Sequence, residues 1–555
     1  MDVISELSKK LNIPEKFFEI PKDTSMGDIA CKYAFTKENK IKYAEQLVKK
    51  ALKLKVVETA RNVGPYVNIF LSWTQIGNEL LKADILKGKN KGKIVIEHTS
   101  TNPTGPIHIG RLRNSLIGDS LCRIYDFYGF DVKKHYYVND IGRQVAIITW
   151  GIENKIKPVK ELIEKYDKYK NKPDFKTFFT YVEAYKKISK NIKFDSEIDD
   201  MLRKSESGDE KTLRKISKTA RNCLKGINKT LMDMGIKFNS FDYESEFILN
   251  KDAFRIAKQL EKLKEFRVIE GAKAVDLSEF GFGKRSGGTV FLRQNGTTVY
   301  LLRDIAYHLW KAKKASRMLN VLGEDHKFEF NELKTLLKLL GKDINLDACH
   351  YSFVTLKDAK MSTRKGITAP VDRLVDEGIE KVYKRIIETN KNIKTERARK
   401  IAKKIAVGAV KYSILKIDKN KQISFSWDDA LKFEGETGPY CQYACVRAKK
   451  LLKKTEIPSR FDASYLVLNE EKELLRYLNE FENIVKEAVV KNEPSAIAHY
   501  MYKLAYYFSK FYESAPVLSE QSRYIRNARI RLVYTFSKIL EKSLNLLGIE
   551  VPAIM

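Results

Sequence analysis

The chain has 555 residues, which predicts about three to four domains and is enough to bury several cores without disulfides or a structural metal. Lysine and arginine number 103 against 71 aspartates and glutamates, which leaves a formal charge of +32 and a pI of about 9.5. This surplus favours a polyanionic partner, most often nucleic acid. A lysine-rich genome that codes for ordinary solvated helix faces would produce the same surplus.

The six cysteines are scattered and none forms a Cys-x-x-Cys pair, so we expect no disulfide framework, no structural zinc and no other metal held by the protein. No apolar run approaches the roughly 18 residues that a membrane span needs. The first residues also lack the basic, apolar and small-residue order of a signal peptide. The sequence therefore predicts a soluble, cytoplasmic protein without a membrane partner, which we expect to be a monomer.

Residues 1–85 are predicted to form a small mixed domain. It begins with a helix, continues with a Lys-rich amphipathic helix near residues 39–54, and ends with a strand over 63–72 that is entered through Gly64-Pro65. The run KGKNKGK at residues 87–93 is typical of a solvated linker and indicates a domain boundary.

The next region alternates strand, loop and helix. A strand-like run at residues 94–98 precedes a loop rich in proline and glycine, and a helix then begins near Arg111 and stops at Gly129. Another strand follows at residues 131–140. This order is the βαβ signature of a doubly wound, Rossmann-type parallel sheet, so the expected fold class is α/β.

The remaining elements extend this core. Residues 151–230 are Lys/Glu-rich with helical patterning, which indicates an insertion into the sheet domain. From residue 371 to the end the pattern is almost wholly helical, so we expect an all-α C-terminal third. Further strands are predicted at 272–277, 289–293, 297–302, 318–323 and 350–356, and C-terminal helices at 399–416, 440–454, 472–490, 495–513 and 524–546.

The sharpest local motif is Pro106-Ile-His-Ile-Gly110, which lies at the strand-to-helix turn. Gly110 allows a ligand to approach the backbone closely, and the N-terminus of the following helix favours phosphate. His108 in such a turn can donate a hydrogen bond to a phosphoryl oxygen as charge builds in a transition state. Taken alone, a His-x-Gly turn is more often structural.

A second motif lies about 250 residues later, at Asp358-Ala-Lys-Met-Ser-Thr-Arg-Lys-Gly366. Two lysines, an arginine, two hydroxyls and a glycine are typical of a mobile cationic loop that suits a triphosphate. Alone, this segment would more often be a solvated basic turn. In this order along the chain, however, each motif supports the interpretation of the other.

The pair resembles the His-Ile-Gly-His and Lys-Met-Ser-Lys-Ser signatures of class I aminoacyl-tRNA synthetases, and longer strings resemble the arginyl-tRNA synthetase family. SMGDIA and NVGPYVNIFL, within residues 1–85, resemble that family's extra N-terminal tRNA-contacting domain. The resemblance covers essentially the whole chain in the family's order. The other strings are TSTNPTGPIHIGRLRNSLIGDSL, VNDIGRQV, VYLLRDIAYHL, DAKMSTRKG, ETGPYCQYACVRAKKLL, YFSKFYESAPVL and LLGIEVPAIM.

The resemblance implies an arginine–tRNA ligase reaction in protein synthesis. Arginine attacks the α-phosphate of ATP to give arginyl-adenylate and pyrophosphate, and the arginyl group then moves to the 3′ end of tRNA(Arg). ATP is a substrate and Mg²⁺ accompanies it. The family's organisation implies a tRNA-contacting domain at 1–85, a catalytic domain at 90–375 with a helical insertion at 151–235, a helical stem at 376–435 and an α-helical anticodon-binding domain at 436–555.

The resemblance also assigns residues to the nucleotide. Two positions depart from the family's signatures, because Arg111 replaces the second histidine and Thr363 stands where a second lysine is common. The Arg111 side chain can also neutralise phosphate charge, although its rigid fork changes the geometry. In the second motif, either Arg364 or Lys365 supplies the missing lysine charge. The implied catalytic residues are His108, Arg111, Lys360, Arg364 and Lys365, and the implied ATP-binding residues are Pro106, His108, Gly110, Arg111, Lys360, Met361 and Ser362.

Selection of arginine requires planar acceptors, since a guanidinium presents a rigid fork of donors. Glu244 is expected to be the principal guanidinium partner, and one helical turn would bring Tyr300 and Asp304 together. Each acid could instead be a surface ion pair or a helix cap. By resemblance the candidates are Asn102, Glu244, Tyr300, Asp304 and, ranked lower, Asp325 with its neighbour His326.

Three surfaces could contact tRNA: the N-terminal domain, the Lys-rich insertion and the helical bundle. Aromatic and cationic side chains in the bundle suit unstacked anticodon bases, although aromatics at helical spacing are as often core residues. The candidates are Tyr440, Tyr443, Arg447, Tyr507 and Tyr512.

Four alternatives compete with this interpretation. A cysteinyl-tRNA synthetase would need a zinc site that the scattered cysteines do not offer, and synthetases for branched aliphatic amino acids carry a longer editing insertion. A small-molecule adenylate-forming ligase would need neither the +32 charge nor the helical tail. A non-catalytic RNA-binding relative is suggested only by Arg111.

Overall fold

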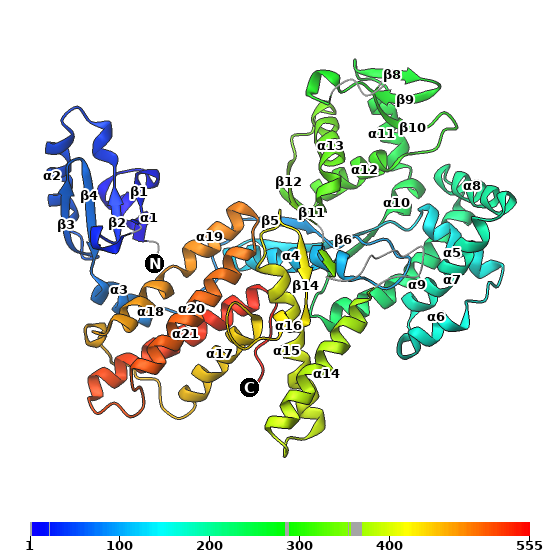
Figure 1. The fold of residues 1–555 in the computed structure, drawn as a ribbon. Helices are drawn as coiled ribbons and strands as arrows, with labels where there is room; N and C mark the ends of the chain where they lie inside the picture. The colour runs from blue at the N-terminus through cyan, green and yellow to red at the C-terminus, as the bar shows by residue number, and fades with distance from the viewer. Residues whose placement is uncertain (1–2, 22, 283–287, 353, 357–368) are drawn as a thin grey trace.

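The computed structural model describes residues 3–555 except 22, 283–287, 353 and 357–368. A parallel sheet lies at the centre of the molecule (Figure 1). The N-terminal domain and a helical bundle lie on one side of it, and the helical insertion lies on the other. Among the described helices, none combines the length and apolarity required to cross a membrane.

The central sheet is parallel throughout and has the strand order β12-β11-β5-β6-β7. The middle strand β5 buries Ile94, Val95 and Ile96 completely, as expected of a strand covered on both faces. The chain runs outward from β5 in one direction and later in the other, so a topological switch point lies at its carboxyl end. This confirms the predicted α/β fold class. The strands are β5 (Lys93–Glu97), β6 (Asp131–Val138), β7 (Ser240–Tyr243), β11 (Arg317–Gly323) and β12 (Asn345–Tyr351).

Helix α4 (Ile109–Tyr128) connects β5 to β6 and ends at Gly129, which adopts φ 115° and donates its backbone N–H to the last turn. Only glycine adopts this left-handed cap without strain, so the predicted stop is confirmed. Between β6 and β7 the chain forms the predicted helical insertion. Its helices are α5 (Arg143–Glu153), α6 (Lys160–Lys165), α7 (Pro173–Ile188), α8 (Ile192–Glu206) and α9 (Glu210–Asp233).

Between β7 and β12, the described residues form β11, a small antiparallel sheet of order β10-β9-β8 and four α-helices. The predicted strand at 297–302 is wrong, because α12 begins at Tyr300 and only an isolated bridge joins Thr298 to Leu292. A short apolar run cannot by itself distinguish a strand from a buried helix turn. The elements are α10 (Glu244–Leu249), α11 (Asp252–Leu260), β8 (Phe266–Ile269), β9 (Ala272–Val275), β10 (Thr289–Leu292), α12 (Tyr300–Ala312) and α13 (Lys327–Leu339).

The N-terminal domain contains an antiparallel sheet of order β1-β2-β4-β3. The strand predicted over 63–72 is one arm of a hairpin, whose turn contains Gly64 at φ 58°. The other arm, β3, escaped prediction because its sequence VETARNV is largely polar and exposed. The elements are α1 (Val3–Leu11), β1 (Phe18–Glu19), β2 (Ile29–Cys31), α2 (Lys40–Ala51), β3 (Val57–Val63), β4 (Tyr66–Leu71) and α3 (Trp73–Lys82).

The C-terminal region is helical except for β14, which pairs in parallel with β13. The strand predicted at 350–356 is divided between β12 and β13, and the helix predicted at 472–490 is divided between α18 and α19 at Glu480. The elements are β13 (Val354–Leu356), α14 (Val371–Thr389), α15 (Thr395–Leu415), β14 (Ile423–Phe425), α16 (Trp427–Ala430), α17 (Gly438–Leu452), α18 (Asn469–Asn479), α19 (Phe481–Lys491), α20 (Ser495–Ser514) and α21 (Arg523–Leu546).

Short 3-10 helices complete the secondary structure. They are η1 (Glu15–Phe17), η2 (Thr24–Met26), η3 (Tyr33–Thr36), η4 (Asp167–Tyr169), η5 (Ser278–Phe280), η6 (Glu324–His326) and η8 (Ala463–Tyr465).

The helical bundle and the central sheet share one hydrophobic core through α4. Tyr125 donates its hydroxyl to Asn492 Oδ1 at 2.7 Å, and Ser120 donates to the carbonyl of Leu546 at 3.0 Å. The helix that follows the first motif is therefore fixed against the bundle. This contact holds the two parts in a defined relative position.

Candidate active site

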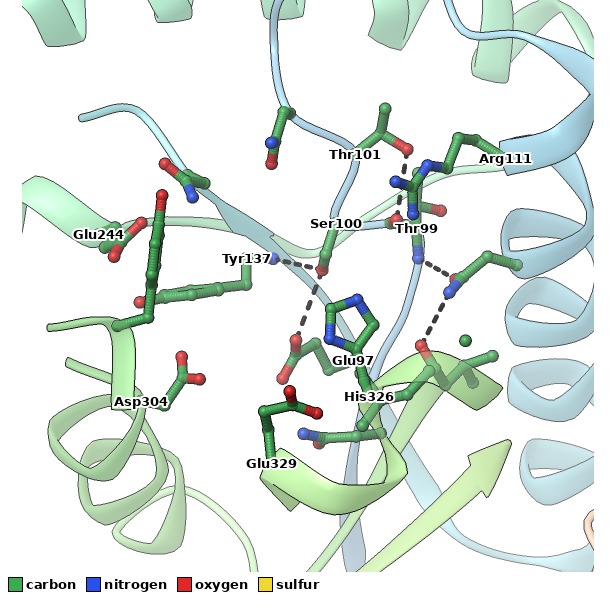
Figure 2. A pocket seen from close by; sticks show the side chains of 18 of the residues that line it. Glu97, Thr99, Ser100, Thr101, Arg111, Tyr137, Glu244, Asp304, His326 and Glu329 are labelled. Atoms are coloured by element: carbon green, nitrogen blue, oxygen red, sulfur yellow. Dashed lines mark hydrogen bonds between the residues drawn. The ribbon is translucent and has the colours of Figure 1, made fainter. Parts of the chain in front are cut away.

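A cavity of about 590 Å³ lies at the carboxyl ends of the parallel strands, where the strand order reverses. Figure 2 shows Glu244 and Asp304 together on one side of it, with Arg111 on the opposite side. The structure therefore brings residues from distant parts of the chain to one place. The predicted residues that line the cavity are Asn102, Pro106, His108, Arg111, Glu244, Tyr300, Asp304 and His326.

Among the described residues, two of those predicted to bind arginine or ATP, Asp325 and Gly110, do not line this cavity. Asp325 is exposed and its carboxylate lies 3.8 Å from His326 Nε2. Gly110 lies beside the cavity, where a Cβ atom would stand 3.1 Å from the His108 ring, so a larger residue there would press against the motif's own histidine. Lys360, Met361, Ser362, Arg364 and Lys365 lie outside the described residues, as does Thr363.

The turn after β5 has a strained backbone. Thr99 adopts φ 73° and Ser100 adopts φ 38°, a conformation that costs non-glycine residues about 1–3 kcal/mol each. Asn114 on α4 holds this turn, since its Oδ1 accepts from Thr99 N at 2.5 Å and its Nδ2 donates to Val321 O at 2.8 Å. The turn aims Ser100 into the cavity, where its hydroxyl accepts from Tyr137 N at 3.2 Å (Figure 2).

His108 is the N-cap residue of α4 and is half-buried at the cavity wall. Its ring Nδ1 has no hydrogen-bond partner among the described residues. Burial, followed by the nearby Arg111 cation, lowers the pKa of His108 to about 4. The ring is therefore neutral near pH 7 and keeps one N–H to donate.

The first motif pairs with the chain just after the second. Ile109 N donates to Ala369 O at 3.3 Å, and Val371 N donates to Ile107 O at 2.9 Å. Residues 369–371 directly follow the undescribed segment 357–368. The described flank of the second motif therefore lies against the turn that carries His108.

Glu244 is buried at the cavity wall, with 1% of its surface exposed. Its Oε1 accepts from Arg303 Nε, whereas its Oε2 has no partner among the described residues. Burial raises the pKa of Glu244, and the Arg303 guanidinium opposes that rise. The residue predicted to hold a guanidinium thus already holds one from the protein itself.

Asp304 lies one helical turn after Tyr300 on α12 and is half-buried at the same wall. Within the described residues, no cation lies within ion-pair distance of its carboxylate. Burial, followed by the charges of Glu244 and Glu97, raises the pKa of Asp304 to about 8. A ligand cation placed here would favour the ionised carboxylate.

A buried network below the cavity escaped prediction. Lys311 is fully buried, and its Nζ donates to Glu97 Oε2 at 2.5 Å and to Asn320 Oδ1 at 3.1 Å. His308 contributes Nε2 at 3.1 Å from the same Nζ. Glu97 ends β5, a position typical of ligand contacts in open α/β sheets, and this signal could have found it. The network neutralises Glu97 and leaves Asp304 without a charge partner.

Binding of a cationic ligand in this cavity should depend on pH through Asp304. A bound cation favours the ionised form, so below a pKa of about 8 the ligand must displace a proton. The dissociation constant of the guanidinium ligand that the sequence predicts should therefore rise by about tenfold for each pH unit below 8. Binding measured between pH 6 and 9 tests this. A dissociation constant that is flat between pH 6 and 8 would contradict it.

A second cavity of about 340 Å³ adjoins the first and shares Asn102 and Tyr300 with it. Tyr181 and Tyr185 of the insertion helix α7 line its far side, together with Arg143. The active-site cavity thus continues toward the insertion. Within the described residues, no group of three or more His, Cys, Asp or Glu side chains is arranged to hold a metal ion.

The five predicted tRNA-binding residues divide into two groups. Tyr443, Arg447 and Tyr512 line a groove of about 520 Å³ on the bundle, and the Arg447 guanidinium lies 3.8 Å from the Tyr512 ring centre. Tyr440 and Tyr507 are half-buried in the bundle. Tyr440 donates to Ser509 Oγ at 3.2 Å, and Tyr507 stacks on Tyr477 with centroids 4.3 Å apart.

Comparison with known families agrees with this geometry. Residues 75–427 match the family of tRNA synthetases class I (R), catalytic domain, and residues 441–555 match the DALR anticodon binding domain. Together with the doubly wound sheet and its cavity, these matches define a class I aminoacyl-tRNA synthetase.

Individual relatives narrow the assignment. An arginine–tRNA ligase from Methanocaldococcus jannaschii is 36% identical over 584 residues, which cover 100% of this chain and 98% of the relative. One from Methanothrix thermoacetophila is 36% identical over 502 residues, covering 90% and 87%. The structure of Thermus thermophilus arginyl-tRNA synthetase matches with a TM-score of 0.85 and 25% identity over 100% of this chain and 99% of that one. The chain belongs to the arginine–tRNA ligase family, which confirms the resemblance drawn from its motifs.

Proposed function

We propose that the 590 Å³ cavity is the place where this arginine–tRNA ligase activates L-arginine with ATP, before the arginyl group moves to the 3′ end of tRNA(Arg) in protein synthesis. The observation that carries this proposal is the charge pattern of the wall. Three carboxylates are at least half-buried at the wall: Glu97 and Glu244 have protein cations as partners, whereas Asp304 has none among the described residues. The fourth lining carboxylate, Glu329, is exposed to solvent. Such a wall suits a ligand with one positive charge, as a guanidinium has.

The opposite side of the cavity is proposed to bind ATP. Neutral His108 donates to a phosphate oxygen, Arg111 supplies positive charge, and Gly110 allows close approach to the N-terminus of α4. Pro106 shapes the same turn. Mg²⁺ arrives with the ATP phosphates as part of that substrate.

The second motif is proposed to complete the phosphate site. Its residues Lys360, Met361, Ser362, Arg364 and Lys365 keep the roles implied by the family. The pairing of Ile107–Ile109 with residues 369–371 supports this proposal, because it brings the described flank of the motif to the His108 turn. Positive charge there would neutralise the pyrophosphate that leaves.

Arginine is proposed to lie with its guanidinium between Asp304 and Glu244 Oε2, against the Tyr300 ring. Asn102 lines both cavities, so we place it near the reacting end of arginine and the incoming tRNA end. Asp325 keeps no role in this proposal, because its exposed carboxylate does not line the cavity.

For tRNA(Arg), we propose that the groove of Tyr443, Arg447 and Tyr512 holds unstacked anticodon bases. The N-terminal domain and the insertion are proposed as further contacts, and Tyr440 and Tyr507 stay predictions. The proposal includes four domains, at residues 1–85, 90–375 with the insertion at 151–235, 376–435 and 436–555. It also includes a monomeric state and a cytoplasmic location.

ATP–pyrophosphate exchange in the presence of tRNA(Arg) tests the proposal. Exchange should require arginine and should not proceed with cysteine or an aliphatic amino acid. If folded protein supplied with tRNA shows no exchange with arginine, the proposed function is wrong.

The basic surplus should appear as a salt dependence of tRNA binding. If it serves tRNA, the logarithm of the affinity should fall with log salt by roughly 0.7–0.9 for each phosphate neutralised. Measuring the tRNA KM between about 50 and 200 mM salt checks this. The KM values for arginine and ATP serve as controls and should change far less. A flat tRNA KM would favour genome composition as the origin of the charge.

A further inference from the structure

Arg303 places a guanidinium of the protein inside the proposed arginine site. It lies on α12 directly before Asp304 and only 2% of its surface is exposed. Besides Glu244, its partner is Thr298, since Nη1 donates to the Thr298 carbonyl at 2.9 Å and to its hydroxyl at 2.8 Å. The guanidinium also lies 4.8 Å from the Tyr300 ring centre. These contacts fix Arg303 from several sides.

This arrangement limits what Glu244 can offer to a ligand. A free carboxylate accepts a guanidinium with both oxygens at once, but Oε1 already accepts from Arg303 Nε and only Oε2 lacks a partner. The Arg303 cation also cancels the charge of Glu244, as Lys311 cancels that of Glu97. Of the carboxylates that are at least half-buried at the wall, Asp304 is therefore the one without a cation among the described residues, while the fourth lining carboxylate, Glu329, is exposed to solvent.

We infer that Arg303 is a positioning residue that sets the specificity of the arginine site. It occupies one oxygen of Glu244 and balances its charge, so that the substrate meets one hydrogen-bond acceptor from Glu244 and one unpaired negative charge from Asp304. The charge of the wall's buried and half-buried carboxylates then matches the single charge of a guanidinium. This inference rests on the proposed function, because it assumes that arginine binds in the 590 Å³ cavity.

Removal of Arg303 should change binding in a way that simple destabilisation would not. In Arg303→Met, Glu244 is buried without a cation and takes up a proton near neutral pH. Arginine must then displace a proton from Glu244 as well as from Asp304. We expect the arginine KM at pH 7 to rise by about tenfold or more. We also expect this KM to depend on pH more steeply than in the wild type, because arginine binding displaces about one proton more. We expect kcat to change less than the KM does.

A double variant separates charge balance from damage to the fold. Arg303→Met/Glu244→Gln removes the cation and its partner charge together, so the pH dependence of the arginine KM should return to that of the wild type. Its KM should also be lower than that of Arg303→Met. Arg303→Lys keeps the positive charge beside Glu244 and should likewise restore the single-proton dependence.

The bundle offers a matched control. Arg529 Nε donates to Glu471 Oε1 at 2.6 Å, and both residues are buried far from the cavity. Arg529→Met also breaks a buried Arg–Glu pair, which destabilises a fold. It should lower the melting temperature while leaving the arginine KM and its pH dependence unchanged.

Failure of the role assigned to Arg303 can be distinguished from failure of the proposed arginine site. If Arg303→Met has the pH dependence of the wild type, or if the double variant is no better than the single one, the role assigned to Arg303 is wrong. If Asp304→Asn leaves the arginine KM unchanged, the proposed arginine site itself is wrong.

Discussion

Asp304→Asn is expected to lower kcat/KM for arginine. The loss corresponds to on the order of 3–5 kcal/mol of transition-state stabilisation, because the substitution leaves a desolvated ligand cation without its charge partner. Among the carboxylates that are at least half-buried at the cavity wall, Asp304 is the one for which the described residues provide no ion pair. The rate of ATP–pyrophosphate exchange with tRNA(Arg) present measures the loss. Asp325→Asn makes the same chemical change on an exposed carboxylate outside the cavity, and it should leave exchange near the wild-type rate.

Citrulline gives this prediction a second readout. It is nearly isosteric with arginine but neutral, and it carries an oxygen where arginine has a donor, so it brings no cation to pair with the Asp304 carboxylate. Asp304→Asn should therefore narrow the ratio of exchange rates between arginine and citrulline. Lysine carries the charge but cannot fill a planar fork, so it should bind weakly in the wild type. An unchanged arginine-to-citrulline ratio would remove Asp304 from the site.

The structure makes Asp304, and not Glu244, the better acidic residue to substitute in a test of arginine binding. Sequence reasoning favours Glu244, for which Glu244→Gln would be expected to cost about as much. In the fold, that substitution also takes the charge partner from Arg303, so a loss of activity would mix two causes. The ion pair between Glu244 and Arg303 joins α10 to α12, and residues 59 positions apart give no sign of pairing in the sequence.

Local signals predicted the elements that position the site. The loop and helix around His108, the stop at Gly129 and the helical insertion follow from turn residues and periodicity, which depend on near neighbours along the chain. The spacing of Tyr300 and Asp304 likewise predicted their shared helix turn, although the apolar run around Tyr300 also suggested a strand. Exposed β3 lacks the hydrophobic alternation that makes a strand recognisable. Strand β14 alternates buried and exposed residues, but its three residues are too few for the pattern to stand out.

The charge balance of the site could not be predicted. Lys311 and Glu97 lie 214 positions apart and form a buried pair only when β5 and α12 pack together. The same holds for the raised pKa of Asp304, which arises from burial and from Glu244 and Glu97. Sequence motifs predicted several of the side chains that line the cavity. Which of them carry an unpaired charge depends on tertiary packing.

His108→Ala is expected to slow formation of arginyl-adenylate by about 10²–10³-fold, as the loss of one oriented hydrogen-bond donor typically does. Burial and Arg111 lower the pKa of His108 to about 4, so the ring donates as a neutral imidazole. Protonation of His108 should therefore produce no inflection near pH 6.5 in the activation rate. Single-turnover formation of the adenylate, measured against pH with tRNA(Arg) present, tests both statements.

The fold should survive this substitution, since the turn is held by backbone groups. Ile109 N and Ile107 O make the bonds to residues 369–371, and no side-chain hydrogen bond of His108 caps α4. Alanine keeps these bonds, so the melting temperature should change little. Arg111→His should keep most activity, because it restores the residue that is usual in the family and Arg111 is exposed. His499→Ala, which removes an exposed histidine of the bundle, is the matched control. If His108→Ala activates arginine normally while Arg111→His is inactive, the phosphate contact belongs to Arg111 and our assignment of the turn is wrong.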